Sequence, residues 1–323
     1  MRQLLTTTMK ILVTGAAGFI GSHVAQRLLQ RGDDVIGLDN FAPNYSRARK
    51  EANLKEYAGH KHFTFIEADI RDAQTVRNLF EAQKFDRVMH LAAMGNVRYS
   101  VEHAQEYTAV NIGGTVNLLE AARLSGTRYF VFASTSSVYG NAPIPFVESE
   151  PVAQPLAPYP ATKIACEVMA HTYHVAFGMK CTGLRFFNVY GPRGRPDMMP
   201  YEFTRKISAG ETLRVFDEGR PQRDWTYIDD IVSGVMAAID AGYEYEIFNL
   251  GRGEPIGLSR FIEIIEGLVS RKAVIQHAPL PPTEPLMTYA NVEKAERLLN
   301  YHPRTSIEEG LSRFYEWYRQ TTH

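Results

Sequence analysis

The chain has 323 residues, of which 45% are hydrophobic and 22% charged, a composition typical of a folded globular protein with room for one large or two small domains. Its formal net charge of −1 excludes a bulk electrostatic attraction to nucleic acid or to an anionic membrane surface. No apolar run is long enough for a membrane-spanning helix, and the leader Met1–Met9 is too short and too polar for a signal peptide.

The first predicted strand, Lys10–Thr14, runs into three glycines, and an apolar helical pattern continues from them to Gly32. Gly15 lets the chain turn sharply, Gly18 lets the backbone approach a pyrophosphate, and Gly21 lets the helix pack closely on the strand. The helix N-terminus offers free N–H groups to phosphates. Three such glycines also occur in tight turns that bind nothing, so the spacing alone leaves both interpretations open.

The next predicted strand favours the dinucleotide interpretation. It covers 34–38 and ends at Asp39, where an acid is placed to bind the hydroxyls of an adenosine ribose. Because a carboxylate at this position would repel a 2′-phosphate, we expect NAD rather than NADP.

Strands and helices then alternate, which predicts an α/β fold with a doubly wound parallel sheet of the Rossmann type. The further strands of the first half are expected at Phe63–Ala68, Arg87–Leu91 and Tyr129–Ala133, and the helices at Arg47–Tyr57, Asp72–Gln83 and Glu102–Leu124. Asn111, Gly113 and Gly114 interrupt the last of these helices, where a polar residue and two glycines are locally costly. Either a packing or ligand requirement or a simple bend would explain them.

The second half begins with a helix at Tyr159–Phe177 and a strand at Lys180–Phe187 and then becomes less regular. We expect an NAD-binding domain over residues 9–190 and a smaller region, mainly for substrate binding, over 191–323, with the chain free to cross between the two. Helices are predicted at Met198–Ala209, Asp229–Ala241, Leu258–Ser270, Asn291–Asn300 and Ile307–Tyr318, and strands at Leu213–Phe216 and Ile247–Asn249.

Tyr159 and Lys163 are the candidate catalytic pair. They lie four residues apart on a predicted helix, so both side chains can point into one cleft. A free tyrosine has a pKa of ~10, and a nearby ammonium and a nicotinamide cation would lower that pKa and favour the phenolate. Thr135 follows the fifth strand, at the sheet edge where ligands bind, and its hydroxyl can relay the proton of the reacting oxygen. An amphipathic helix could carry the same pair without any activity.

Together these motifs resemble the extended short-chain dehydrogenase/reductase family. Within it the chain is similar to nucleotide-sugar epimerases, most closely the UDP-glucuronate 4-epimerases, from about Met9 to the C-terminus. The segments that carry this resemblance are Thr14–Gly21, Thr135–Gly140, Tyr159 with Lys163, Leu184–Pro192, Gly194–Met198 and Gln222–Asp230.

The resemblance implies that Tyr159, assisted by Thr135 and Lys163, removes the proton of the sugar 4′-hydroxyl while hydride passes to NAD, and that the keto sugar turns and takes the hydride back on its other face. It implies no metal. The implied NAD-binding residues are Gly15, Ala17, Gly18, Phe19, Ile20, Asp39, Asn40, Asp69, Ile70, Leu91, Ala92, Ala93, Asn111, Tyr159, Lys163 and Phe186. The implied UDP-sugar-binding residues are Thr135, Ser136, Ser137, Tyr159, Asn188, Arg195, Val215 and Arg223.

The residues after Thr135 distinguish among the relatives. Sugar dehydratases and sugar-acid decarboxylases of this family place a carboxylate there, whereas this chain has Ser136 and Ser137, which disfavours both activities. Arg195 and these two hydroxyls suit a sugar carboxylate, because they can hold it with charge-assisted hydrogen bonds. A solvent-exposed loop arginine is the alternative interpretation of Arg195.

Two departures from the pattern keep other substrates open. Asn188 replaces the usual threonine of glucuronate epimerases and is more typical of galactose-type enzymes, and Pro281–Glu284 replaces a segment near the diphosphate. The alternatives are therefore a UDP-glucose or UDP-N-acetylglucosamine 4-epimerase and, less favoured, a UDP-glucuronate decarboxylase or a non-catalytic nucleotide-binding protein.

Several residues receive a structural interpretation. Asp229 and Asp230 suit a helix start, and His90 is expected in the core. Arg98 lies in an uncertain loop, where substrate contact is open but not favoured. Cys166 and Cys181 lack metal spacing and favour buried thiols in a reduced, cytoplasmic setting. The family resemblance implies a homodimer built from the helices 102–124 and 159–177.

Overall fold

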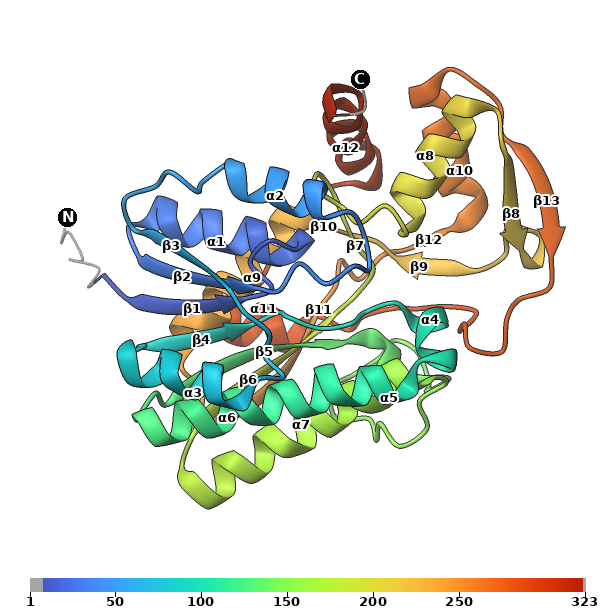
Figure 1. The fold of residues 1–323 in the computed structure, drawn as a ribbon. Coiled ribbons are helices and arrows are strands. Elements are labelled where there is room, and N and C mark those ends of the chain that lie inside the picture. Colours follow the sequence, from blue (N-terminus) through green and yellow to red (C-terminus); the bar gives the residue numbers. More distant parts are fainter. Residues whose placement is uncertain (1–7, 322–323) are drawn as a thin grey trace, which may run out of the picture.

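The fold is centred on a seven-stranded parallel sheet, in a computed structural model that describes residues 8–321 (Figure 1). The strands lie in the order β11-β6-β5-β4-β1-β2-β3, and every neighbouring pair is parallel. Their bounds are β1 (Lys10–Thr14), β2 (Asp34–Asp39), β3 (Phe63–Glu67), β4 (Arg87–His90), β5 (Tyr129–Thr135), β6 (Lys180–Phe186) and β11 (Tyr245–Leu250). This confirms the predicted doubly wound sheet.

The strand order reverses between β1 and β4, because the chain builds outward from β1 in one direction and then from β4 in the other. In sheets of this kind ligands bind at the reversal, beyond the carboxyl ends of the strands. The glycine loop after β1, the Leu91–Ala93 segment after β4 and Thr135 at the end of β5 all lie at that edge.

Helices cover both faces of the sheet, which explains why its strands are apolar throughout. In β1, Ile11 and Val13 belong to one core cluster and Leu12 to the other, as the alternation of side chains along a strand requires. In Figure 1, α1, α2 and α9 lie above the sheet and α3, α6 and α7 below it. Their bounds are α1 (Phe19–Arg31), α2 (Arg47–Lys55), α9 (Ile228–Ala241), α3 (Ala73–Ala82), α6 (Gly114–Ser125) and α7 (Pro158–Phe177).

The C-terminal region adds three two-stranded sheets at one side of the central layer (Figure 1). They pair β8 (Thr212–Phe216) with β13 (Val274–Ala278), β9 (Gln222–Asp224) with β12 (Pro255–Gly257), and β7 (Val189–Tyr190) with β10 (Thr226–Tyr227). The helices of this part are α8 (Met199–Ala209), α10 (Leu258–Val269), α11 (Glu293–Leu299) and α12 (Ile307–Thr321). Because β11 joins the central sheet and α9 packs on α1, the chain returns to the first half after residue 227.

The segment predicted as an interrupted helix at Glu102–Leu124 is helical over most of its length, and it is irregular where Asn111, Gly113 and Gly114 stand. The structure has α4 (Val97–Glu102), α5 (Ala104–Tyr107), a π-helical turn η1 (Thr108–Gly113) and then α6. Gly114 begins α6 where a Cβ would overlap the Ile70 side chain. The close approach between α6 and the segment after β3 is therefore a packing requirement.

The short strands β7, β9, β10, β12 and β13 were not predicted, because they are brief or exposed and carry little periodicity. Two short 3₁₀ turns, η2 (Ser136–Tyr139) and η3 (Asp217–Gly219), complete the structure. Most of the leader, residues 1–7, lies outside the described residues. Among residues 8–321, none of the helices combines the length and apolar character that crossing a membrane requires.

Candidate active site

The glycine loop has the close packing that a pyrophosphate-binding turn needs. Gly15 has a φ of 71°, which favours glycine, and a Cβ there would lie 2.8 Å from the Ala92 nitrogen. A Cβ at Gly21 would overlap the Gly15 carbonyl oxygen, so α1 begins as close to the turn as the backbone allows. The loop thus leaves bare backbone at a helix N-terminus, and its residues fit a dinucleotide phosphate.

Asp39 ends β2 as predicted, and its carboxylate is buried against the same loop. Its oxygens accept hydrogen bonds from the amides of Ala17 (3.1 Å) and Phe41 (2.9 Å). Burial raises the pKa of Asp39, and the charge of Lys50 opposes that rise. Nearby, Asn40 donates to Asp69 at 2.9 Å, so these two predicted NAD-binding residues lie together.

Tyr159 and Lys163 lie in the first turns of α7, against the end of β5. The Lys163 ammonium is 3% exposed and donates to the Ala133 carbonyl at 2.9 Å. The Tyr159 amide donates to Ser100 Oγ at 3.1 Å, which anchors the start of α7 to α4. A buried ammonium has further N–H groups to satisfy, so this site fits a ligand with hydroxyl groups, such as a ribose.

In the protein alone, burial raises the pKa of Tyr159, while a hydrogen bond with Thr135 and then the charge of Arg195 oppose the rise. Desolvation of the phenol thus outweighs the nearby positive charge. The expected lowering also depends on the charge of a nicotinamide cation, so it stays a prediction for the NAD-bound protein.

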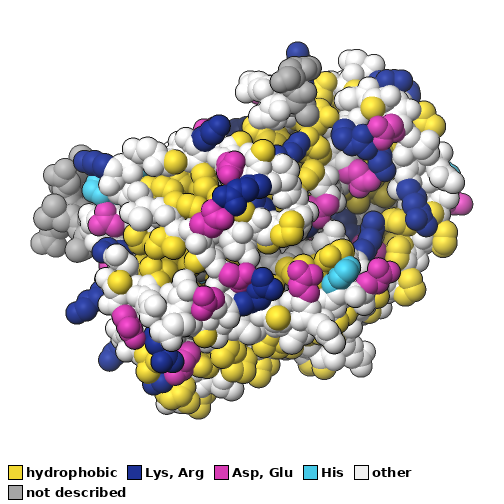
Figure 2. All heavy atoms as spheres, viewed as in Figure 1, with side chains coloured by type: hydrophobic (Ala, Val, Ile, Leu, Met, Phe, Trp, Pro, Cys, Tyr) yellow, Lys and Arg dark blue, Asp and Glu magenta, His cyan; other side chains and the backbone are white. Residues whose placement is uncertain are grey.

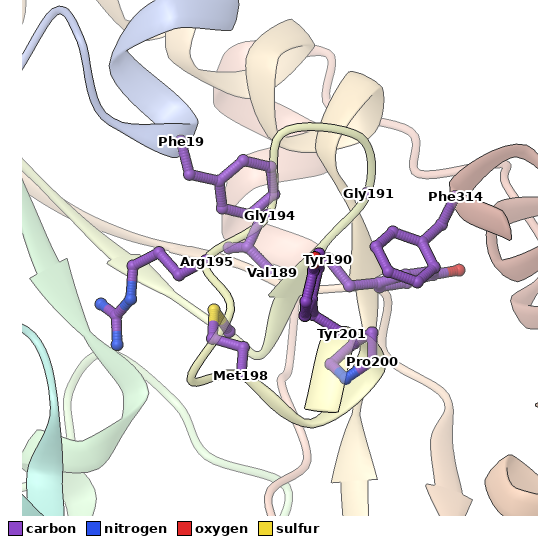
Figure 3. Close-up of a pocket in the computed structure, with 10 residues that line it drawn as sticks. All are labelled: Phe19, Val189, Tyr190, Gly191, Gly194, Arg195, Met198, Pro200, Tyr201 and Phe314. Atoms are coloured by element: carbon purple, nitrogen blue, oxygen red, sulfur yellow. The ribbon is translucent and has the colours of Figure 1, made fainter. Parts of the chain in front are cut away.

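Arg195 lies beside Tyr159 rather than in solvent. A Cβ built on Gly95 would lie 2.9 Å from Arg195 Nη1 and 3.9 Å from the Tyr159 hydroxyl, so a missing side chain makes room for both groups. Figure 3 shows Arg195 on a pocket that it shares with Phe19, the first residue of α1, and with Met198. Arg195 thus lines a pocket with the first residue of α1, and its Nη1 lies near the Tyr159 hydroxyl.

The hydroxyls that follow β5 are also gathered here. Thr135 Oγ1 lies 3.2 Å from Ser137 Oγ and accepts from the Ser137 amide at 3.2 Å. Ser136 is 6% exposed. The hydroxyls of Thr135 and Ser137 thus lie together at the carboxyl end of β5, and the shared role predicted for them and Ser136 stays a prediction.

Arg223 lies in β9, and its Nη2 donates to Glu284 at 3.1 Å. Arg98, for which substrate contact was not favoured, donates to the other oxygen of Glu284 at 3.0 Å. Burial lowers the pKa of Arg223, and the charge of Glu284 opposes this. Two arginines from separate elements therefore converge on one carboxylate, within the segment that departs from the family pattern.

The other residues predicted to bind NAD or the UDP-sugar lie in different parts of the fold. Asn188 Oδ1 accepts from Thr288 at 3.2 Å, and Val215 is buried in β8. Asn111 is engaged with protein groups, since its side chain bonds the backbone of Met94 and the Thr162 hydroxyl. Ile20 lies in the first turn of α1, and the remaining predicted residues lie at strand ends or shortly beyond them, at Ile70, Leu91, Ala92, Ala93 and Phe186.

The residues with structural interpretations are also accounted for. His90 is 2% exposed and lies between the hydroxyls of Thr14 and Thr115, and both cysteines are buried free thiols. Asp230 accepts from the amides of Arg304 and Thr305 and so holds a distant loop to the start of α9. Within residues 8–321, no group of three or more His, Cys, Asp or Glu side chains is arranged to hold a metal ion.

Sequence reasoning missed Asp224, which follows Arg223. Its side chain is fully buried and accepts from the amides of Arg252 (2.7 Å), Gly253 (2.9 Å) and Ala290 (3.0 Å). Burial raises the pKa of this carboxyl, and those hydrogen bonds oppose the rise. The only sequence signal was its place inside the Gln222–Asp230 segment, because its partners are distant along the chain.

A family model described as the NAD dependent epimerase/dehydratase family matches residues 11–251. The chain belongs to this family. The predicted family and the predicted cofactor, NAD, are confirmed.

Members of this epimerase family match over almost the whole chain. The chain is 41% identical to the UDP-glucuronate 4-epimerase of Thermodesulfobacterium geofontis, with 96% of each chain covered. The solved UDP-glucuronic acid 4-epimerase of Bacillus cereus, in complex with UDP-glucuronic acid and NAD, is 36% identical, with 97% of this chain and 99% of that chain covered and a TM-score of 0.91. The UDP-glucose 4-epimerase of Thermotoga maritima, solved with UDP-glucose, is 31% identical, with 98% and 100% covered and a TM-score of 0.88.

Proposed function

We propose that the protein is an NAD-dependent isomerase that interconverts UDP-glucuronate and UDP-galacturonate at C4 of the sugar. The observation that carries this substrate is the position of Arg195 beside the Tyr159 hydroxyl. A uronate differs from a neutral hexose by a carboxylate close to C4, and a partly buried guanidinium near the reacting group can recognise that difference. The similarity to glucuronate epimerases from two bacteria supports the same substrate.

Tyr159 is the base in this proposal. Its phenolate takes the proton of the 4′-hydroxyl and later returns it to the C4 oxygen as the ketone is reduced, with the Thr135 hydroxyl in hydrogen-bonding contact throughout. Bound NAD⁺ supplies the acceptor for the C4 hydride and gives the same hydride back. Between the two transfers the 4-keto sugar turns about its diphosphate linkage, so the protein has to hold UDP firmly and the sugar ring loosely.

The cofactor is expected at the predicted residues. The glycine loop and the N-terminus of α1 would hold its pyrophosphate, and Asp39 would bind the adenosine ribose. Lys163 would bind the ribose next to the nicotinamide, because its ammonium has N–H groups left after the bond to Ala133. We assign the diphosphate of the substrate to Arg223, the uracil to the strand around Val215, and the nucleotide sugar also to Asn188.

Arg195 is also expected to prevent decarboxylation of the keto intermediate. A 4-keto uronate is a β-keto acid, and it loses CO₂ when the bond from C5 to its carboxylate lies perpendicular to the ketone plane. Arg195, Ser136 and Ser137 would hold the carboxylate away from that geometry with charge-assisted hydrogen bonds. Since no carboxylate follows Thr135 in the sequence, the chain has no acid there to promote elimination or decarboxylation.

The test offers UDP-glucuronate, UDP-glucose and UDP-N-acetylglucosamine in parallel, without added reductant. We expect UDP-galacturonate as the main product, little loss of CO₂, and retention of deuterium placed at C4. Exclusive turnover of the neutral sugars would favour the alternative that Asn188 suggests, a UDP-glucose or UDP-N-acetylglucosamine 4-epimerase. Exchange of the C4 deuterium with solvent would exclude the hydride mechanism.

Replacing Thr135 by Ala is expected to move activity to higher pH. The hydrogen bond from Thr135 is the largest influence that lowers the Tyr159 pKa, so its loss raises that pKa and leaves less phenolate at neutral pH. We expect kcat/KM at pH 7 to fall by about 10²-fold, with part of the loss recovered in alkaline buffer. A pH–rate profile measures this, and an unchanged acid limb would contradict the role given to Thr135.

The protein is also proposed to form a homodimer through α6 and α7. Val168 and Val175 lie two turns apart on α7 and are 56% and 69% exposed, and Phe177 and Leu124 are exposed beside them. Figure 2 shows hydrophobic side chains along the lower part of the molecule, where α7 runs in Figure 1. Such a patch is typical of a protein–protein interface.

The two free cysteines support a cytoplasmic location.

Lysines in place of Val168 and Val175 are expected to produce a monomer, because four charges would meet across a two-fold interface. Sedimentation equilibrium of the double variant should give half the mass of the wild-type protein. Lysine in place of Ile275 is the matched control, since this residue is 43% exposed in β13, far from α7 in the fold. A double variant with unchanged mass would exclude this interface.

A further inference from the structure

Asp197 binds one edge of the Arg195 guanidinium through two hydrogen bonds. Arg195 Nε donates to Asp197 Oδ1 at 3.0 Å and its Nη2 to Oδ2 at 2.7 Å, the paired geometry that fixes a guanidinium plane. The two side chains are only 22% and 32% exposed. The pairing with Asp197 also raises the pKa of Arg195, against the effect of burial. This contact leaves the Nη1 side of the arginine for other partners.

Asp197 is itself held by the opposite half of the fold. Asn96 Nδ2 donates to Asp197 Oδ2 at 3.0 Å. Asn96 is fixed in turn, because its Oδ1 caps α4 by accepting from the Tyr99 amide at 3.1 Å. The Tyr107 hydroxyl also accepts from the Asn96 amide at 3.1 Å and donates to its carbonyl at 2.6 Å. Asp197 therefore has little freedom to move, and neither has the edge of Arg195 that it binds.

The free side of the arginine lies near the Tyr159 hydroxyl. A Cβ on Gly95 would be only 2.9 Å from Nη1 and 3.9 Å from that hydroxyl. Two neighbouring residues thus contribute to the position of Arg195. Gly95 leaves room for Nη1, and Asn96 binds Asp197, which in turn binds the other edge of the guanidinium. A flexible arginine would lose much rotational freedom when it binds a ligand. Here the side chain is already ordered in the folded protein, so ligand binding costs less conformational entropy.

We propose that Asp197, held by Asn96, is a positioning residue that fixes Arg195 with its Nη1 side toward the substrate and thereby sets the preference for a sugar that carries a carboxylate. The inference rests on the proposed function and adds residues to which neither the family pattern nor the sequence assigned a role. Asp197 does not touch the substrate in this proposal and acts only through Arg195.

The test compares ligand affinities of the NAD-bound protein by calorimetry, in a Tyr159→Phe background so that no ligand is converted. The ligands are UDP-glucuronate, UDP-glucose and UDP. In Asp197→Asn the shape is kept and the charge is lost, and we expect the preference for UDP-glucuronate over UDP-glucose to fall at least fivefold. The affinity for UDP should stay within twofold, which a general loss of structure would not allow.

Two further variants separate positioning from folding. Asn96→Ser keeps a side chain that can cap α4 but is too short to reach Asp197, so the preference should fall in the same direction by about twofold. Asp197→Glu keeps the charge and should recover part of the preference. Glu211→Gln is the matched control, because it breaks another bidentate arginine pair, with Arg205 on the surface, and should leave the preference unchanged.

An unchanged preference in a folded Asp197→Asn protein would overturn the proposal, and an increased one would mean that Asp197 competes with the substrate. If the Asp197 variant does not fold, Asn96→Ser decides in the same way. A failure of the proposed function is seen separately, because the Asp197-intact protein would then show no preference for UDP-glucuronate.

Discussion

Phenylalanine in place of Tyr159 is expected to reduce turnover by about 10³-fold while UDP-sugar and NAD remain bound. The substitution removes one oxygen and keeps the ring, which packs edge-on against Tyr107 with ring centroids 6.2 Å apart. Neither Thr135 nor Lys163 can replace the lost base, because a hydroxyl ionises far above neutral pH and the ammonium has no acceptor. The loss therefore falls on proton transfer.

The measurement is a single-turnover assay that follows NADH absorbance and product together. Tyr173→Phe is the matched control, since Tyr173 lies further along α7 and loses only a hydrogen bond to Glu120 at 3.2 Å. It should keep wild-type turnover. A Tyr159→Phe protein that retained more than a tenth of wild-type turnover would require another base, and the proposed mechanism would have to be abandoned.

Short-range patterns predicted the parts of the site that lie close together along the chain. The turn from β1 into α1 is contained in Lys10–Arg31, and its glycines are required by backbone contacts inside that segment or by Ala92 across the sheet edge. Tyr159 and Lys163 share one helix face for the same local reason. Arg195 required the family resemblance as well, because a single loop arginine has no periodicity.

Long-range contacts could not be predicted from the sequence. Asp224 binds amides of residues 28, 29 and 66 positions later, and Asn96 meets Asp197 across 101 positions. β11 pairs with β6 after the chain has passed through the C-terminal region. A sequence pattern reports which face of an element is apolar, but not which distant polar group will meet a given carboxylate.

The buried ion pair of Glu167 and Arg185 is another long-range contact that the sequence pattern could not predict. Its disruption is expected to have the second large effect, on stability. Glu167 in α7 accepts from Arg185 Nε at 2.9 Å and from Nη2 at 2.7 Å, and from Ser134 at 2.6 Å. The side chains of the pair are 6% and 4% exposed. Arg185 also donates to the Tyr139 hydroxyl at 2.9 Å, so the network runs from α7 through β5 and β6 to η2.

Glutamine in place of Glu167 is expected to reduce the free energy of unfolding by about 3 kcal/mol, because the Arg185 guanidinium would stay buried without a counter-charge. Burial alone would lower the Arg185 pKa, and its hydrogen bonds and charge interaction with Glu167 are what raise it. An amide can accept one of the two hydrogen bonds but cannot balance the charge. Denaturant unfolding, followed by far-UV circular dichroism, measures the loss.

Glu120→Gln provides the comparison that isolates burial. Glu120 also pairs with an arginine, Arg123, but the two side chains are 36% and 29% exposed, so water screens the charge that remains. This variant should lose less than about 1 kcal/mol. Equal losses in both variants would mean that burial is not the cause.

Since Ser134 bonds Glu167 and precedes Thr135, we also expect Glu167→Gln to lower turnover at temperatures where the protein is still folded.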